Sequence, residues 1–275
     1  MPKNNQLKLG AVLSYVAIFI NIAAGMLYTP WMVQQIGQSS YGLYTLANSL
    51  ITLFLVDFGL SSATSRYISK YRAEGNFEAV NNFLGAIYKL YLIITAVILA
   101  AFVILYFFID KIYAELTPLE IERFKVVYII SASFAVFNFP LITFDGILTA
   151  YEKFVQLKLA EILYRVGFVV STLIALLLGK GLYALVSLHA IIGIVVAGYK
   201  FIIIKSKLPI KINFKYSDNG MYKEIFSFSI WVTLSSLAQR LIFNITPSIL
   251  GIVANSTSIA IFGIVATPFL AIESR

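Results

Sequence analysis

The chain has 275 residues, of which 60% are hydrophobic and 12% charged, and its formal net charge is +8. Soluble domains are typically about 45–50% apolar and about 25% charged, so this composition excludes an ordinary soluble protein and indicates a membrane protein. The absence of cysteine excludes disulfides, thiolate metal sites and cysteine nucleophiles. The basic residues cluster in short loops between apolar runs, which indicates membrane topology and anionic lipid rather than nucleic acid.

Apolar segments of membrane-crossing length recur along the whole sequence. Crossing the hydrocarbon core takes about 20 mostly apolar residues. We therefore predict an all-α polytopic membrane protein with about eight transmembrane helices. They are placed at residues 9–33, 41–68, 82–108, 124–150, 157–178, 181–204, 224–249 and 257–273. The first segment is too long for the core of a signal peptide, so we expect an uncleaved first span.

The loops between these spans differ in basic charge on the two sides of the membrane. In or beside the loops of one side lie 13 Lys and Arg residues, against 4 on the other side. Because basic loops stay in the cytoplasm, this asymmetry predicts a multi-pass membrane protein with a cytoplasmic N-terminus. An even number of spans returns the C-terminus to the same side.

The longest connector, residues 205–223, divides the chain into six spans and two spans. We predict a six-helix N-terminal lobe at 1–204, a cytoplasmic basic connector at 205–223, and the first two helices of an incomplete C-terminal lobe at 224–275. Within the connector, LPIKINFKY alternates apolar and basic residues. Such a segment lies along the lipid headgroups or is an ordinary basic loop, and the pattern fits both interpretations.

The second predicted span carries a polar stripe and ends in a basic loop. Small and polar residues recur at spacings of three, four and seven, which places them on one helix face: Thr45, Asn48, Thr52, Gly59, Ser62 and Arg66. Asp57 points nearly opposite this face. It therefore needs a different neighbour, or the helix is irregular near Gly59.

Comparable stripes occur in other spans. They include Asn21 in the first span, Ser131, Asn138, Asp145 and Thr149 in the fourth, Lys158, Glu161, Arg165 and Thr172 in the fifth, and Ser229, Thr233, Ser236 and Arg240 in the seventh. Small and hydroxylated residues at these spacings either pack helices together or line a substrate path. The sequence leaves both interpretations open.

Charged residues within the spans are harder to explain as packing, because an ionisable group near the bilayer centre costs roughly 2.5–3.5 kcal/mol. Arg240 lies in the middle of its span, so we expect it to face protein or water. The other charged members of the stripes lie nearer to span ends, where snorkelling is an alternative. Glu161 precedes Arg165 by four residues, so these two can also neutralise each other as an ion pair.

The sequence contains no motif for a cofactor or a metal. We find no metal-ligand cluster, nucleophile elbow or P-loop. His189 is the single histidine, and we expect a packed polar residue there rather than a proton relay. No cofactor, metal or catalytic residue is therefore predicted.

Residues 29–76, TPWMVQQIGQSSYGLYTLANSLITLFLVDFGLSSATSRYISKYRAEGN, resemble the N-terminal module of the bacterial polysaccharide transporters. This family includes the O-antigen and lipid-linked oligosaccharide flippases of the multidrug/oligosaccharidyl-lipid/polysaccharide exporter superfamily. The resemblance is carried by YGLY at 41–44, DFGL at 57–60 and Arg66 before the basic loop. Residues 146–154, GILTAYEKF, are similar to the exit of the family's fourth span, and residues 226–262 resemble its seventh span and the start of its eighth.

The resemblance implies two six-helix lobes around a central cavity that opens alternately to each side. It also implies that the protein is a flippase and not an enzyme. The implied substrate is an oligosaccharide on undecaprenyl pyrophosphate, which is moved to the outer leaflet for cell-surface polysaccharide synthesis. Because arginine matches phosphate geometry, we expect headgroup contacts from Arg66, Arg165 and Arg240, together with Asn48 and Asn21. Three acids are candidates for ion coupling or for structural pairing: Asp57, Asp145 and Glu161. The expected partners are the lipid-linked glycan, membrane lipid and polysaccharide polymerase machinery, and not nucleic acid.

Two features depart from the family pattern. Family members usually have 12 or more spans, so we expect a fragment, a truncated product or half of a split protein. Many members carry an acid near the end of the seventh span, where this sequence reads Asn244-Ile245-Thr246. An ion-coupling role at that position therefore has no support here.

Two other functions are weighed against the flippase. A multidrug or small-cation extruder of the same fold would need an acid-rich cavity, whereas three arginines lie within or beside the spans. A membrane glycan polymerase or ligase would need a large outer loop with catalytic groups, and the longest outer connector has only about 15 residues.

Overall fold

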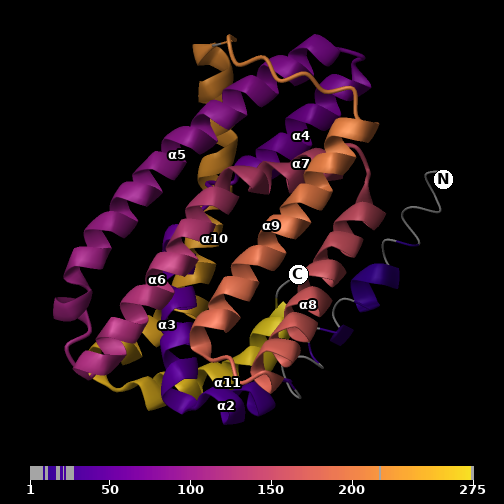
Figure 1. The fold of residues 1–275 in the computed structure, drawn as a ribbon. Helices are drawn as coiled ribbons and strands as arrows, with labels where there is room; N and C mark the ends of the chain where they lie inside the picture. Colours follow the sequence, from indigo (N-terminus) through magenta and orange to yellow (C-terminus); the bar gives the residue numbers. More distant parts are fainter. Residues whose placement is uncertain are drawn as a thin grey trace.

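The apolar segments form long α-helices in the computed structural model, which describes residues 9, 12–16, 19, 20, 22, 28–216 and 218–273 (Figure 1). For residue 243 and residues 267–273 it describes only the backbone. Most of the predicted first span, including Asn21, lies outside the described residues. The named elements are α2 (Thr29–Ile36), α3 (Gln38–Phe54), α4 (Leu60–Ala73), α5 (Phe77–Ile112), α6 (Pro118–Asn138), η2 (Phe139–Ile142), α7 (Thr143–Ala150), α8 (Phe154–Leu177), α9 (Leu182–Lys207), α10 (Asn219–Val253) and α11 (Ser256–Glu273).

The predicted all-α, multi-pass architecture is confirmed. Within the described residues, five segments are long and apolar enough to cross a membrane: Phe77–Ile112, Pro118–Ala150, Phe154–Leu177, Leu182–Lys207 and Asn219–Ile242. Asn244–Val253 and Ser256–Ala266 are shorter apolar helices. The six predicted spans from 82–108 to 257–273 therefore each have a helical counterpart, with ends that differ by a few residues.

The second predicted span, residues 41–68, is not one continuous helix: of the two alternatives given for Asp57, the structure has the irregular helix near Gly59. α3 ends at Phe54 and α4 begins at Leu60. Between them Phe58 (φ 53°) and Gly59 (φ 67°) take up the left-handed conformation, which cannot continue a right-handed helix. The carboxylate of Asp57 stabilises this break, because it accepts hydrogen bonds from the backbone amides of Gly59 at 3.0 Å and Ser61 at 3.4 Å.

A second interruption lies between α6 and α7. Pro140 sits in the 3₁₀ turn η2, where its missing amide hydrogen costs no helical hydrogen bond. The turn directs α7 against α4. This contact is close, since a Cβ on Gly146 would lie 2.6 Å from the carbonyl oxygen of Ser61 and 2.8 Å from the Cβ of Thr64. Glycine therefore permits the two backbones to approach.

The long helix α5 shows which surface faces lipid. It lies at the outside of the bundle (Figure 1). Its outward side chains are large and apolar, with Ile93, Val97 and Phe107 exposed by 60%, 64% and 71%. The opposite face is buried in the core, where Phe83 and Ile87 have no exposed surface. A face this apolar belongs in hydrocarbon rather than in water.

The helix α3 lies against α6, α10 and α11. Its contact with α11 is made at two glycines, Gly42 and Gly263, which we call the glycine seam. Any Cβ on Gly42 would collide with the carbonyl oxygen of Ser256, and a Cβ on Gly263 would lie 3.0 Å from the side-chain oxygen of Thr45. At Gly42 the backbone of α3 therefore touches the first residue of α11 directly, while at Gly263 the backbone of α11 lies against side chains of α3.

We expect Gly42→Ala to destabilise the protein, because its Cβ must displace the start of α11. Overpacking of this kind costs about 1–3 kcal/mol. Thermal melting of the purified protein in detergent measures the effect. The matched control is Gly198→Ala in α9, where a Cβ meets nothing within 4 Å. That variant should melt at the same temperature or higher, and an equal loss of stability in both variants would contradict the close contact.

Candidate functional site

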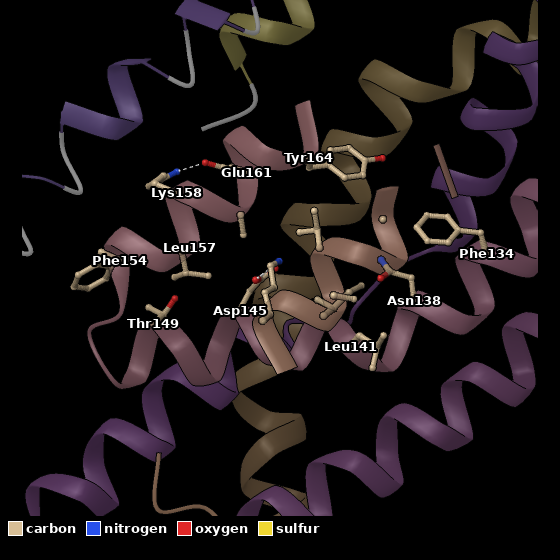
Figure 2. Close-up of a pocket in the computed structure, with 16 residues that line it drawn as sticks. Phe134, Asn138, Leu141, Asp145, Thr149, Phe154, Leu157, Lys158, Glu161 and Tyr164 are labelled. Atoms are coloured by element: carbon tan, nitrogen blue, oxygen red, sulfur yellow. Dashed lines mark hydrogen bonds and ion pairs between the residues drawn. The ribbon is translucent and has the colours of Figure 1, made fainter. Parts of the chain in front are cut away.

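Two adjoining cavities lie among the helices. The larger one, which we call the lobe cavity, has a volume of about 560 Å³ and is lined by α6, η2, α7, α8 and α9 (Figure 2). The smaller one has a volume of about 290 Å³ and is lined by α3, α6 and α9, together with Leu55. Phe134 and Asn138 line both cavities. The two spaces therefore follow one side of α6 and its continuation into α7.

The polar stripe predicted for the fourth span lines these cavities. Ser131 and Asn138 line the smaller one, while Asn138, Asp145 and Thr149 line the lobe cavity. Asn48 of α3, a predicted substrate contact, lines the smaller cavity. Figure 2 shows Asp145 near the middle of the lining side chains and Asn138 to its right, near Phe134. The helical spacing therefore found a cavity wall, although Pro140 breaks the regular helix within it.

The charges in the lobe cavity occur as pairs. Asp145 accepts a hydrogen bond from the ammonium group of Lys200 at 2.6 Å. Glu161 accepts one from Lys158 at 2.8 Å, and a dashed line marks this pair at the edge of Figure 2. The ion pair that the structure gives Glu161 is therefore with Lys158, three residues earlier in α8. With each acid beside a lysine, the four charges of the cavity sum to zero.

His189 of α9 lies in the wall of the smaller cavity. Its Nδ1 is 3.1 Å from the hydroxyl oxygen of Tyr44. Four aromatic rings surround it, with centroids between 5.0 and 6.4 Å away: Tyr44, Phe134, Tyr164 and Phe168. This environment is that of a packed polar residue held by one hydrogen bond.

Arg66 lies away from the two cavities, at an open hollow between α4 and α10 with a volume of about 680 Å³. We call it the basic hollow, because Arg66 and Lys223 line it together with one acid, Glu224. The guanidinium carbon of Arg66 is 4.7 Å from the centroid of the Phe228 ring. Trp231, exposed by 75%, forms another part of its wall. The hollow thus combines a net positive charge with aromatic surface.

Arg240 lies at the break between α3 and α4. Its guanidinium is partly buried and donates a hydrogen bond to the carbonyl oxygen of Thr52, in the last turn of α3. Asp57 interacts with it electrostatically. Arg240 therefore faces protein, as its mid-span position predicts. It satisfies a carbonyl group that the end of α3 leaves without an intrahelical partner.

Arg165 is half-buried in α8, close to Tyr164 and His189. Of the three cavities described, Arg66 lines one, and neither Arg165 nor Arg240 lines any of them. Among the described residues, none of these three cavities brings the three arginines together. The structure instead brings together Asn138, Asp145 and Glu161 in the lobe cavity.

At the end of the bundle opposite the basic hollow, Glu120 joins three segments. Its carboxylate accepts hydrogen bonds from the hydroxyl groups of Ser39, at the start of α3, and Ser256, at the start of α11. The same carboxylate forms a capping box with Thr117 at the start of α6. One side chain therefore ties the first turns of α3, α6 and α11 together.

Sequence patterns did not reveal several of these residues. Lys200 lies within α9 beside Asp145, and Glu120 lies in the first turn of α6. Their partners lie 55 to 136 residues away along the chain, so helical spacing carries no signal for them. No group of three or more His, Asp or Glu residues in the described part of the chain could hold a metal ion.

Comparison with known families places this architecture. The model of the family described as polysaccharide biosynthesis protein matches residues 7–274, nearly the whole chain. The chain belongs to the polysaccharide biosynthesis protein family. No curated protein sequence matches this family member.

Solved structures share the fold of this polysaccharide biosynthesis protein. An inward-facing multidrug resistance MATE family transporter of the MOP superfamily matches with a TM-score of 0.73 and 16% identity, over 93% of this chain and 60% of that one. The lipid II flippase MurJ, in an inward closed conformation, matches with a TM-score of 0.70 and 16% identity, over 95% of this chain and 54% of that one. A MOP superfamily transporter from Pyrococcus furiosus matches with a TM-score of 0.66 and 16% identity, over 99% of this chain and 69% of that one. The chain thus has the MOP transporter fold and spans 60% of the first and 54% of the second of these proteins.

A double-mutant cycle tests the pair in the lobe cavity. Asp145→Asn should destabilise the protein, because it leaves Lys200, whose side chain is only 19% exposed, beside a neutral amide. Adding Lys200→Met should recover part of the loss, with a coupling energy of about 0.5–3 kcal/mol. Unfolding in detergent measures this energy. The comparison pair is Lys125 and Asp110, exposed by 27% and 56%, for which we expect a smaller coupling.

Proposed function

We propose that the protein is a membrane flippase that moves an oligosaccharide linked to undecaprenyl pyrophosphate from the cytoplasmic to the outer leaflet. Membership in the polysaccharide biosynthesis family and the MOP transporter fold support this proposal. The inner bacterial membrane, a cytoplasmic N-terminus and contact with polysaccharide polymerase machinery belong to the same proposal. The observation that carries it is the basic hollow.

The basic hollow suits a diphosphate on a lipid. A diphosphate is a multiply charged anion, and guanidinium N–H groups pair with its oxygens in a bidentate manner. Among the described residues, Arg66 makes ring contacts with Tyr67 and Phe228 but no hydrogen bond or ion pair, so its N–H groups are available. Lys223 adds a second cation, and Trp231 and Phe228 offer apolar surface for the first isoprene units. The hollow is open, which suits a bulky glycan.

The lobe cavity is a weaker site for a charged substrate. Its two acids are each neutralised by a lysine, Lys200 or Lys158, so it has no net charge to attract a diphosphate or a drug cation. A multidrug or small-cation extruder would instead need an unpaired acid in such a cavity. The paired charges therefore favour the flippase over the extruder. Ion coupling by Asp57, Asp145 or Glu161 remains a prediction, as does contact of Asn48, Asn21 and Arg165 with the substrate.

Binding of the diphosphate can be read from Trp231. In a Trp31→Phe background Trp231 is the single tryptophan, and undecaprenyl diphosphate in detergent micelles should change its fluorescence more strongly than undecaprenol does. Arg66→Ala should weaken this binding about 10- to 100-fold, as expected for a charged hydrogen bond. The matched control is Arg123→Ala, an exposed arginine at the other end of the bundle, which should bind normally. Equal binding of alcohol and diphosphate would overturn the assignment of the hollow.

Arg240 gives a second test, in export rather than in binding. Arg240→Ala in the full-length protein should reduce the appearance of the lipid-linked glycan in the outer leaflet, because the α3–α4 break loses its cation. Arg240→Lys should restore export partly, since it keeps the charge but loses the planar donor group. Protein levels in the membrane are measured alongside. Unchanged export by Arg240→Ala at normal protein level would remove Arg240 from the transport pathway.

A further inference from the structure

The segment between α9 and α10 is bound to the helical bundle by hydrogen bonds to α5. Residues 208–216, which we call the strap, cross the N-terminal part of α5 (Figure 1). The amide of Lys211 donates to the side-chain oxygen of Asn81 at 2.8 Å, and the amide of Asn213 to the carbonyl of Asn81 at 3.1 Å. The side chain of Asn213 donates to that of Asn82 at 2.7 Å, and Lys89 donates to the carbonyl of Tyr216 at 2.8 Å.

The surface of α5 is shaped for the strap. A Cβ on Gly85 would collide with the carbonyl group of Asn213, so glycine lets the two backbones touch. One turn later the ring of Tyr88 lies 6.3 Å from that of Phe214. With hydrogen bonds on both sides of Gly85, the strap keeps one register along α5. Its outward side chains therefore have defined positions.

The position of the strap along α5 indicates how deep the strap lies in the membrane. Directly after Lys89 comes a run of 20 residues without charge, 90–109, which ends at Asp110. At about 1.5 Å per residue this run is about 30 Å long, the thickness of the hydrocarbon core. The strap contacts the turns just before this run. It therefore lies at the boundary between acyl chains and headgroups.

The outward side chains of the strap suit that boundary. Ile212 and Phe214 are exposed by 37% and 51%, although the strap itself is docked. Residues 205–216 contain four lysines and no acid, and all four are exposed: Lys205, Lys207, Lys211 and Lys215. Apolar side chains at this depth enter the acyl boundary, while lysines beside them attract anionic headgroups.

We propose that the strap is a binding surface for anionic phospholipid headgroups, in which Lys211 and Lys215 hold phosphates and Ile212 and Phe214 enter the acyl boundary. This surface is separate from the basic hollow and does not depend on what the protein transports. It gives the membrane a direct contact with the segment that joins α9 to α10.

The test uses the full chain in vesicles with a tryptophan placed on the strap. In a background with Trp31→Phe and Trp231→Phe, Phe214→Trp provides the single reporter, and Ile212→Trp is the second reporter. Two kinds of phosphatidylcholine vesicle are compared. Each contains a small fraction of lipid with brominated acyl chains, which quench a neighbouring tryptophan. The brominated lipid is phosphatidylglycerol in one kind and phosphatidylcholine in the other. We expect stronger quenching by the brominated phosphatidylglycerol, and a loss of this preference at high salt.

Charge removal identifies the groups responsible. Lys211→Gln with Lys215→Gln should reduce the preference for phosphatidylglycerol about tenfold, because each lysine near the surface contributes to it. The matched control is Lys111→Gln with Lys180→Gln, which removes the same charge at the opposite end of the bundle. Equal quenching by the two lipids, or a preference that survives in the strap variant, would overturn the proposal. Absence of quenching by either lipid would show that the strap faces water or another protein, and would overturn it too.

Discussion

The break between α3 and α4 is the constraint that shapes the rest of this structure. Hydrocarbon offers no hydrogen-bond partners, so an interrupted helix is tolerated only where protein or water satisfies the freed backbone groups. The carboxylate of Asp57 accepts the amides of Gly59 and Ser61, while Arg240 donates to the carbonyl of Thr52. The break thus needs α10 beside it. This requirement ties the packing of α10 to the course of α3 and α4.

The sequence predicts the helices well and their interruptions poorly. Six predicted spans correspond to helices because 20 apolar residues have few alternatives in a membrane, and the stripe of Ser131, Asn138, Asp145 and Thr149 does face a cavity. The second span was predicted as one crossing because its hydropathy continues through Asp57 and Gly59, and only the polar face opposite Asp57 indicated an irregular helix near Gly59. Hydropathy cannot show that the backbone at Phe58 and Gly59 is left-handed. That conformation depends on which groups bind the backbone N–H and C=O groups that the break leaves without helical partners. The division into lobes at residues 204 and 223 stays a prediction.

The candidate site shows why charged residues are harder to place than helices. Glu161 has two basic residues within reach on its own helix, and the structure pairs it with Lys158. Asp145 takes its partner, Lys200, from a helix 55 residues away, and Glu120 reaches Ser256 across 136 residues. Such partners follow from tertiary packing, which spacing along one helix does not encode. The same holds for the separation of a neutral lobe cavity from a positively charged basic hollow.

The glycine seam between α3 and α11 has a mechanical consequence. Interlocked side chains would have to leave their rotamers before two helices could part, and that would set a steric barrier. Gly42 faces the backbone of Ser256, and Gly263 faces the side chains of Thr45 and Tyr41, so neither glycine adds a side chain of its own that must disengage. The hydroxyl groups of Ser39 and Ser256 add directional hydrogen bonds to Glu120 at this end. At the two glycines, sliding of α11 along α3 would therefore need fewer side-chain rearrangements than at an interlocked contact, and it would break the hydrogen bonds to Glu120.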